Sequence, residues 1–279
     1  LEERLREYVA AHDRARIGVA VIAEGRDTVS VNGDRDFPMM SVFKFPLALT
    51  VAQWMDENSV SPDDDVAFPP EALMEDTYSP MLKKYGKGLD RLPVRELLQW
   101  SLIESDNNAA DILLRQVGGP DGALSALKGI IGDTDITIGA SEEDMHRDQY
   151  LSYLNRSTPL AMAELFDRFD TTLRHRSSSF SEIAAMLEEC RTGTDRLPAP
   201  LPSAGTVIGH KTGTGFPTPD GRISALNDCG YVHLSDGTRY SIAVFIADSS
   251  YGMDETSGII AGISEIVCTA LLGKQPSEK

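Results

Sequence analysis

Residues 37–49, FPMMSVFKFPLAL, place one serine and one lysine inside an otherwise apolar stretch. Ser41 and Lys44 are three positions apart, so both side chains face the same way on a helical turn. A serine hydroxyl is a weak nucleophile at neutral pH, and a lysine can act as its base if burial or a second cation lowers the lysine pKa. The apolar flanks predict a buried turn that starts a core helix from Ser41 to about residue 57.

A second Ser-x-x-Lys pair, Ser125 and Lys128, shows that this motif alone decides little. A chain of this length contains the pattern about once by chance. The second copy lies in an amphipathic stretch without the apolar surround, which is typical of a surface helix end. For Ser41 the motif therefore leaves a structural role and a catalytic role open, and the rest of the chain has to decide.

The composition limits the partners of the chain. Among 279 residues, 41% are hydrophobic and 43 acidic residues outnumber 26 basic ones, which gives a formal charge of -17. This charge disfavours nucleic acid and anionic membrane surfaces, and no apolar run is long enough to span a bilayer. Three widely spaced cysteines without a C-x-x-C motif indicate no metal site and are expected to be packed thiols. The chain begins at Leu1 without a signal peptide, so we expect a mature or trimmed form, and export stays possible.

Strand patterns lie at both ends of the chain and helical patterns lie between them. Helices are expected over residues 1–11, 94–102, 108–117, 121–128, 159–168, 180–190 and 255–272, and strands over 17–23, 28–31, 206–212, 228–234 and 240–247. The polar segment 132–155 is expected to be a long loop, and such loops are often functional. We predict an α+β fold in which residues 1–37 and 201–279 form an antiparallel sheet flanked by helices. Residues 38–200 form an inserted all-helical region, with the active site between the two.

Two further motifs carry polar side chains of the right chemistry. Ser105-Asp106-Asn107 lies at a helix–helix junction, where Asn107 is either a cap for a helix starting at Asn108 or a carboxamide that holds a substrate. Lys211-Thr212-Gly213 ends a strand and supplies a fixed cation, a hydroxyl and a close backbone approach, although an edge lysine against aggregation is the simpler alternative. Three motifs in this order are rare by chance.

Together the motifs S-x-x-K, S-D-N and K-T-G resemble those of the serine β-lactamase and penicillin-binding superfamily. The resemblance implies that Ser41 is the acylated nucleophile and Lys44 its base or proton relay. Ser105 would pass a proton to the β-lactam nitrogen and Asn107 would bind the substrate side-chain amide. The other implied site groups are Lys211, Thr212, Gly213 and Thr214 for the substrate carboxylate, the backbone N–H groups of Ser41 and Thr214 as oxyanion hole, and Tyr78 in the cleft wall.

The long loop offers the glutamate that class A β-lactamases use to activate the hydrolytic water. Between Glu142 and Glu143, we predict that Glu142 activates the water. The loop is similar to that of the PER-type extended-spectrum branch, in which a histidine stands four residues after the glutamate, as His146 does here. His146 would then help to hold the water, unless it is an ordinary loop histidine. Glu143 replaces the usual proline and Ala140 the usual arginine, so we expect a trans 142–143 peptide and no arginine–aspartate brace.

The resemblance also leaves questions open. No arginine follows Asn227-Asp228, where relatives place one for the substrate carboxylate, and Arg222 is the only substitute considered. The leading interpretation is a periplasmic or secreted class A β-lactamase, monomeric, without cofactor or metal, that acts on small-molecule β-lactams. The alternatives are a penicillin-binding D,D-peptidase and a β-lactam sensor that is acylated but does not hydrolyse the acyl group.

Overall fold

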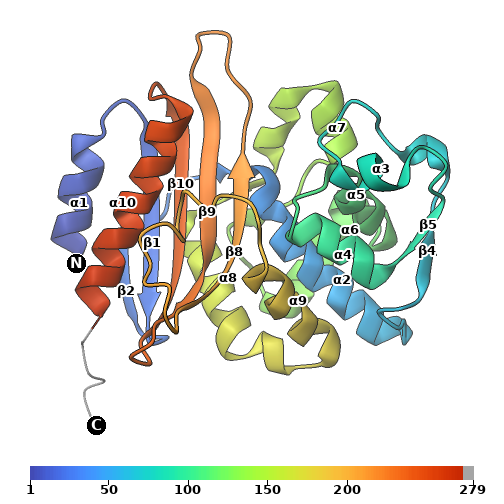
Figure 1. The fold of residues 1–279 in the computed structure, drawn as a ribbon, viewed down its shortest axis with the longest axis horizontal. Helices are drawn as coiled ribbons and strands as arrows, with labels where there is room; N and C mark the ends of the chain where they lie inside the picture. Colours follow the sequence, from blue (N-terminus) through green and yellow to red (C-terminus); the bar gives the residue numbers. More distant parts are fainter. Residues whose placement is uncertain (273–279) are drawn as a thin grey trace.

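A five-stranded antiparallel sheet forms the centre of the computed structural model, which describes residues 1–272. Its order is β2-β1-β10-β9-β8, so strands from both chain ends lie side by side (Figure 1). The strands are β1 (Arg16–Ala23), β2 (Asp27–Val31), β8 (Val207–Thr214), β9 (Ile223–His233) and β10 (Arg239–Ser249). The predicted α+β fold with a sheet from both ends is therefore confirmed, and β8 is an edge strand.

The strands of the sheet have continuous apolar runs, so apolar side chains point to both faces of the sheet. Other elements therefore cover both faces. In β1, Val19 and Val21 belong to the apolar cluster under α1 (Glu2–Ala11) and α10 (Met253–Leu271), whereas Ala20 and Ile22 belong to the other cluster. Side chains of a strand alternate between the faces, so one strand supplies both clusters. The second face packs against α8 (Pro159–Thr171) and the helical region (Figure 1).

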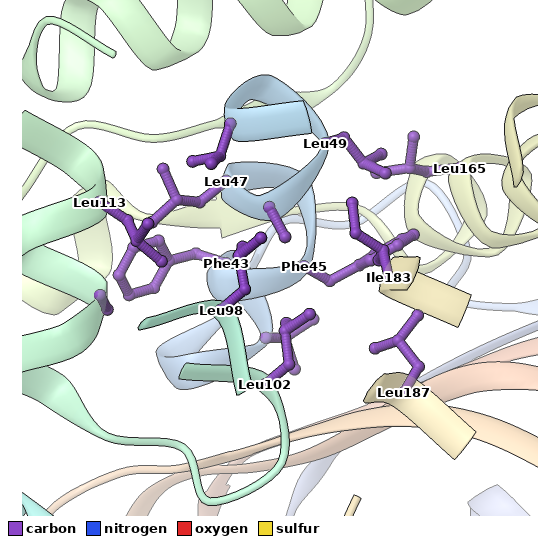
Figure 2. Close-up of a cluster of buried hydrophobic side chains, with 14 of the residues drawn as sticks. Phe43, Phe45, Leu47, Leu49, Leu98, Leu102, Leu113, Leu165, Ile183 and Leu187 are labelled. Atoms are coloured by element: carbon purple, nitrogen blue, oxygen red, sulfur yellow. The ribbon is translucent and has the colours of Figure 1, made fainter. Parts of the chain in front are cut away.

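Helix α2 (Lys44–Asn58) runs through the middle of the helical region, and every residue from Lys44 to Ala52 is buried. A helix that is apolar on all sides is stable only when other elements surround it. Figure 2 shows Phe43 and Phe45 among leucines and isoleucine from neighbouring helices, and Phe45 stacks on Phe166 at 4.0 Å between ring centroids. The surrounding helices are α4 (Val94–Leu102), α5 (Asn107–Gln116), α6 (Gly119–Ile131) and α9 (Ser178–Glu188), with α8 contributing Phe166. The short helix α3 (Pro80–Tyr85) packs on α5.

The structure differs from the sequence prediction in its short elements. Ser41 lies in a 3-10 turn, η1 (Met40–Phe43), so the α-helix begins only at Lys44. The predicted long loop contains α7 (Glu142–Arg147), which begins with a capping box of Ser141 and Asp144. This Ser-x-x-Asp spacing is a helix start signal, and the loop assignment of that part was wrong. The remaining short elements are β3 (Phe37–Pro38), β4 (Asp65–Ala67), η2 (Pro70–Ala72), β5 (Arg91–Pro93), β6 (Ile136–Thr137), η3 (Gln149–Leu154), β7 (Arg156–Ser157) and η4 (Leu173–His175).

Residues 38–200 are thus mainly helical, with a few short strands. The division of the chain into two regions stays a prediction. No helix within residues 1–272 is long and apolar enough to cross a membrane.

Candidate active site

The turn that carries Ser41 is fixed to the end of the sheet. Asn227 Nδ2, on β9, donates to the carbonyl oxygens of Pro38 at 2.8 Å and Met39 at 3.0 Å. Gly213 on β8 allows the close approach, because a Cβ at this position would lie 2.4 Å from the Met39 oxygen. The sequence places Gly213 at a strand end, and the structure explains why no larger residue fits there.

Lys44 is fully buried and is the centre of the polar site. Its Nζ donates to the Ser105 carbonyl oxygen at 2.8 Å and to Asn107 Oδ1 at 2.7 Å. Glu142 Oε1 lies 3.0 Å from the same nitrogen. One side chain therefore joins the Ser41 turn, the Ser105–Asn107 motif and the α7 glutamate.

In the Ser105–Asn107 motif, the residue that caps the following helix is not the one that the capping alternative named. Asp106 is the N-cap of α5 and accepts from Ala109 N at 2.9 Å, so the suggestion that Asn107 caps this helix was wrong. Asp106 also accepts from Ser79 Oγ and Met81 N, both at 2.8 Å. Because Asp106 takes the cap, the Asn107 amide is free to face the site.

Lys211 is the second buried cation. Its Nζ donates to Ser105 Oγ at 2.9 Å and to the Thr212 carbonyl oxygen at 3.0 Å. Complete burial lowers the pKa of Lys211 to about 7, with the Lys44 charge acting in the same direction. Lys211 therefore loses its proton more readily here than in water. A bound anion would favour the protonated form of Lys211.

Two adjoining cavities form the cleft, with volumes of about 260 and 330 Å³. Both are lined by Ser41, Asn107 and Thr214. Glu142 lines the first cavity, and Tyr78, Ser105 and Thr212 line the second. Tyr78 is half exposed, while its carbonyl accepts from Asn107 N at 3.0 Å. The structure thus brings together nearly all residues that the motifs predicted.

The two loop glutamates differ in their surroundings. Glu142 is buried beside Lys44, whereas the Glu143 carboxylate is exposed and pairs with Arg115 and Arg147. Asp111 of α5 holds the start of α7, accepting from Glu142 N at 2.7 Å and Glu143 N at 2.8 Å. Burial raises the pKa of Asp111 to about 6, partly offset by the Glu142 N–H bond.

The two structural predictions about this loop are confirmed. The described residues contain no cis peptide bond, so the bond between Glu142 and Glu143 is trans. Ala140 is held by Asn155, whose Oδ1 accepts from Ala140 N at 3.0 Å and whose Nδ2 donates to Ala140 O at 3.0 Å. Asn155 therefore braces the loop at Ala140, where no arginine stands, and Asp111 holds the start of α7.

His146 is turned away from the cleft. Its Nε2 lies 3.0 Å from Asp76 Oδ1, and the ring lines neither of the two cleft cavities, the first of which Met145 lines. The geometry in this structure therefore gives His146 no contact with Glu142, and the ordinary loop histidine is the better description.

Arg196 is the arginine that the sequence did not reveal. Its guanidinium donates to Thr214 Oγ1 at 2.8 Å and to the carbonyl of Asn227 at 3.0 Å, and it lines the second cavity. Arg222, the suggested substitute, pairs instead with Asp220 in the exposed β8–β9 connection. Arg196 belongs to no motif, and only the folding of segment 189–206 over β8 brings it to the site.

Comparisons with known proteins agree with this geometry. A model of the β-lactamase enzyme family matches residues 1–271. A β-lactamase from Phocaeicola vulgatus is 37% identical, over 92% of this chain and 80% of its own. The extended-spectrum β-lactamase PER-1 from Pseudomonas aeruginosa is 33% identical, over 95% of this chain and 85% of its own. The crystal structure of the TLA-3 extended-spectrum β-lactamase superposes with a TM-score of 0.92 at 33% identity, covering 96% of this chain and 97% of that one.

The chain therefore belongs to the β-lactamase enzyme family. Within that family it is a class A β-lactamase, a hydrolase of β-lactams, as its fold and its relatives show.

Proposed function

We propose that the enzyme hydrolyses β-lactams through an ester on Ser41, which is deacylated by a water that Glu142 activates. The observation that supports this most is the position of Lys44 Nζ, 2.8 Å from the Ser105 carbonyl and 3.0 Å from Glu142 Oε1, on the turn after Ser41. Lys44 can therefore pass a proton to Glu142 as it takes the proton of Ser41, so that Glu142 is the final acceptor.

In acylation, the Ser41 oxygen attacks the β-lactam carbonyl and its proton passes toward Lys44 and Glu142. The backbone N–H groups of Ser41 and Thr214 would stabilise the oxyanion, and both residues line the two cavities. The ring C–N bond breaks, and Ser105 Oγ gives its proton to the departing nitrogen. The proton that Ser41 lost replaces it, so Ser105 is a hydroxyl and Glu142 a carboxylate again before deacylation. Lys211 Nζ, 2.9 Å from Ser105 Oγ, keeps that hydroxyl oriented.

In deacylation, a water attacks the Ser41 ester and Glu142 takes its proton, which returns to Ser41 Oγ as the ester C–O bond breaks. A general base has to be within about 2.6–3.2 Å of the oxygen or nitrogen whose proton it removes. Glu142 Oε1 is buried and accepts no aligned hydrogen bond within the described residues, although the Lys44 ammonium lies nearby. Its lone pairs are thus available to a water in the first cavity.

The second cavity would hold the substrate carboxylate. Thr212, Thr214 and Arg196 line this cavity, and the buried Lys211 lies behind Ser105, to whose Oγ it donates at 2.9 Å. Gly213, between the two threonines, would give backbone access. Asn107 would bind the side-chain amide of the substrate, with its own amide held by Thr77 Oγ1 at 2.9 Å. Tyr78 would form the outer wall.

The same proposal covers the setting of the enzyme. It would act as a periplasmic or secreted monomer on small-molecule β-lactams and confer antibiotic resistance. Turnover of a chromogenic cephalosporin tests the activity directly. Many turnovers per enzyme are expected, and a single stoichiometric burst would favour a penicillin-binding peptidase or a sensor instead.

A further inference from the structure

Asp228 is a buried carboxylate that the proposed mechanism does not use. It lies on β9, directly opposite Thr212 of β8 in the strand register, and its side chain is fully buried. Its Oδ1 lies 2.8 Å from His210 Nδ1, and its Oδ2 accepts from the backbone N–H of Leu197 at 3.1 Å. A buried charge is costly unless hydrogen-bonded partners satisfy it, and both oxygens of Asp228 have such a partner.

The pair with His210 fixes the orientation of this carboxylate. The His210 ring is itself buried, on the edge strand β8. Burial would lower the pKa of His210, but Asp228 raises it to about 10. The imidazolium therefore donates to Asp228 Oδ1 near neutral pH, which leaves Oδ2 for the N–H of Leu197.

The backbone of Leu197 is held on both sides. Its N–H donates to Asp228, and its carbonyl oxygen accepts from Ser264 Oγ of α10 at 2.8 Å. Its side chain is fully buried in the apolar cluster under α10. Arg196 is the preceding residue, so the contacts of Leu197 determine where the arginine side chain leaves the backbone.

Arg196 depends on exact placement, because its guanidinium reaches the ends of two strands at once. Nη1 donates to the carbonyl oxygens of Asn227 at 3.0 Å and Gly213 at 3.3 Å, and Nη2 donates to Thr214 Oγ1 at 2.8 Å. Within residues 1–272 its Nε has no hydrogen-bond partner, although the residue is buried and lines the second cavity. A buried donor without an acceptor is costly, so this arginine keeps capacity for an acceptor that a ligand supplies.

We propose that Asp228 is a positioning residue, which holds Arg196 in place for the substrate carboxylate by fixing the backbone of Leu197. This inference rests on the proposed function, in which Arg196 lines the part of the second cavity that holds the carboxylate. Without the acceptor at Oδ2, the Leu197 N–H would be buried without a partner, and segment 189–206 would shift to satisfy it. The guanidinium would then leave its acceptors at the ends of β8 and β9. Substrates with a free carboxylate should lose more from this shift than substrates without one.

A chromogenic cephalosporin and its methyl ester, which lacks the free carboxylate, test this inference. The quantity to compare is the ratio of kcat/KM for the acid to kcat/KM for the ester. In Asp228→Ala this ratio should fall about tenfold, as for the loss of one charge-assisted hydrogen bond. The loss should appear as a higher KM for the acid, since binding is what the arginine contributes. Asp228→Asn keeps an oxygen for the Leu197 N–H and should keep a ratio close to that of the wild type.

Two further variants separate positioning from stability. Asp170→Asn weakens another buried carboxylate, which pairs with Arg174 and His233 and lines neither cavity. It should lower the thermal unfolding temperature and leave the ratio unchanged. If Asp228→Ala does not fold because His210 is left charged without its partner, His210→Leu combined with Asp228→Leu removes both charges. That double variant should show the same fall in the ratio.

Arg196→Ala distinguishes this inference from the proposed function. If Asp228 acts through Arg196, the ratio in Arg196→Ala/Asp228→Ala should equal the ratio in Arg196→Ala alone. Multiplied losses in the double variant, a wild-type ratio in Asp228→Ala, equal losses in Asp228→Asn and Asp228→Ala, or a fallen ratio in Asp170→Asn would each overturn the inference and leave the role of Arg196 intact. An unchanged ratio in Arg196→Ala alone would overturn the carboxylate role of Arg196, and this inference with it.

Discussion

Replacing Lys211 by alanine removes the buried cation at the carboxylate end of the cleft. Its ammonium is fully buried and donates at 2.9 Å to Ser105 Oγ, and Ser105 lines the second cavity. A charge-assisted hydrogen bond contributes about 1.5–3 kcal/mol, so kcat/KM for anionic β-lactams should fall about 10- to 100-fold. The formal charge of -17 adds to the effect, because the overall field repels an anionic substrate.

The pH dependence supplies an independent readout of the same group. The pKa of Lys211 is about 7, and only its protonated form attracts a carboxylate. In the wild type, kcat/KM should therefore be highest below about pH 7 and decline as the pH rises through that value, since kcat/KM follows the free enzyme. In Lys211→Ala this decline should be absent.

Steady-state kinetics of an anionic chromogenic cephalosporin between pH 5 and about 9 measure both effects, over a range that brackets the lysine titration. Lys211→Met keeps most of the side-chain volume and should show the same loss. Lys128→Ala, in the exposed second Ser-x-x-Lys pair, removes one charge from the surface and should change little. The reasoning is refuted if Lys211→Met keeps wild-type kcat/KM and the wild-type pH profile.

Three further substitutions test other parts of the site. Ser41→Ala should abolish hydrolysis while the thermal unfolding transition persists, and Ser125→Ala should leave kcat unchanged; the reverse pattern would show that the wrong serine was chosen. Asp111→Ala leaves two backbone N–H groups without acceptors, at about 1–3 kcal/mol each, so thermal stability should fall and acyl-enzyme should accumulate in quenched-flow mass spectra, unlike in Arg115→Ala. Gly213→Ala forces a carbon to within 2.4 Å of the Met39 oxygen; kcat should drop about 100-fold, as for a displacement of the nucleophile by about 1 Å, and wild-type kcat would contradict the packing argument.

The elements with strong periodicity were predictable from the sequence. The helix 94–102 has the predicted bounds, and the helix after Thr158 begins at Pro159 with the Thr158 side chain accepting from Ala161 N. The hairpin of β1 and β2 and the strands near the C-terminus followed from apolar alternation in the same way. Local pattern sufficed because local hydrogen bonds and one buried face determine these elements.

The motif residues were predictable as a set, whereas the role of each residue within the set was not. The capping role fell to Asp106 instead of Asn107 because the helix begins one residue earlier than the pattern indicated. His146 stands four residues after Glu142, on the same side of α7, but its ring pairs with Asp76 of a distant segment. One residue of helix register decides the first case and a long-range pairing the second, and a sequence pattern resolves neither.

Long-range contacts were beyond sequence reasoning. Arg196 reaches Thr214, and Asn227 holds the Ser41 turn, across separations of 18 and 188 residues or more. Thr192 and Thr212 meet only because segment 189–206 folds over the edge strand. Such contacts depend on the complete fold and have no local signature.

The intact mass of Glu142→Gln after mixing with a β-lactam tests the central claim most directly. If Glu142 activates the deacylating water, the variant should still be acylated on Ser41 but should hydrolyse the acyl-enzyme slowly. The spectrum should then show the mass of the protein plus one intact β-lactam. Glu143→Gln, one residue along the same helix with its carboxylate in solvent, should show free protein. An adduct with Glu143→Gln but normal turnover with Glu142→Gln would move the base by one residue. Normal turnover in both variants would contradict the mechanism.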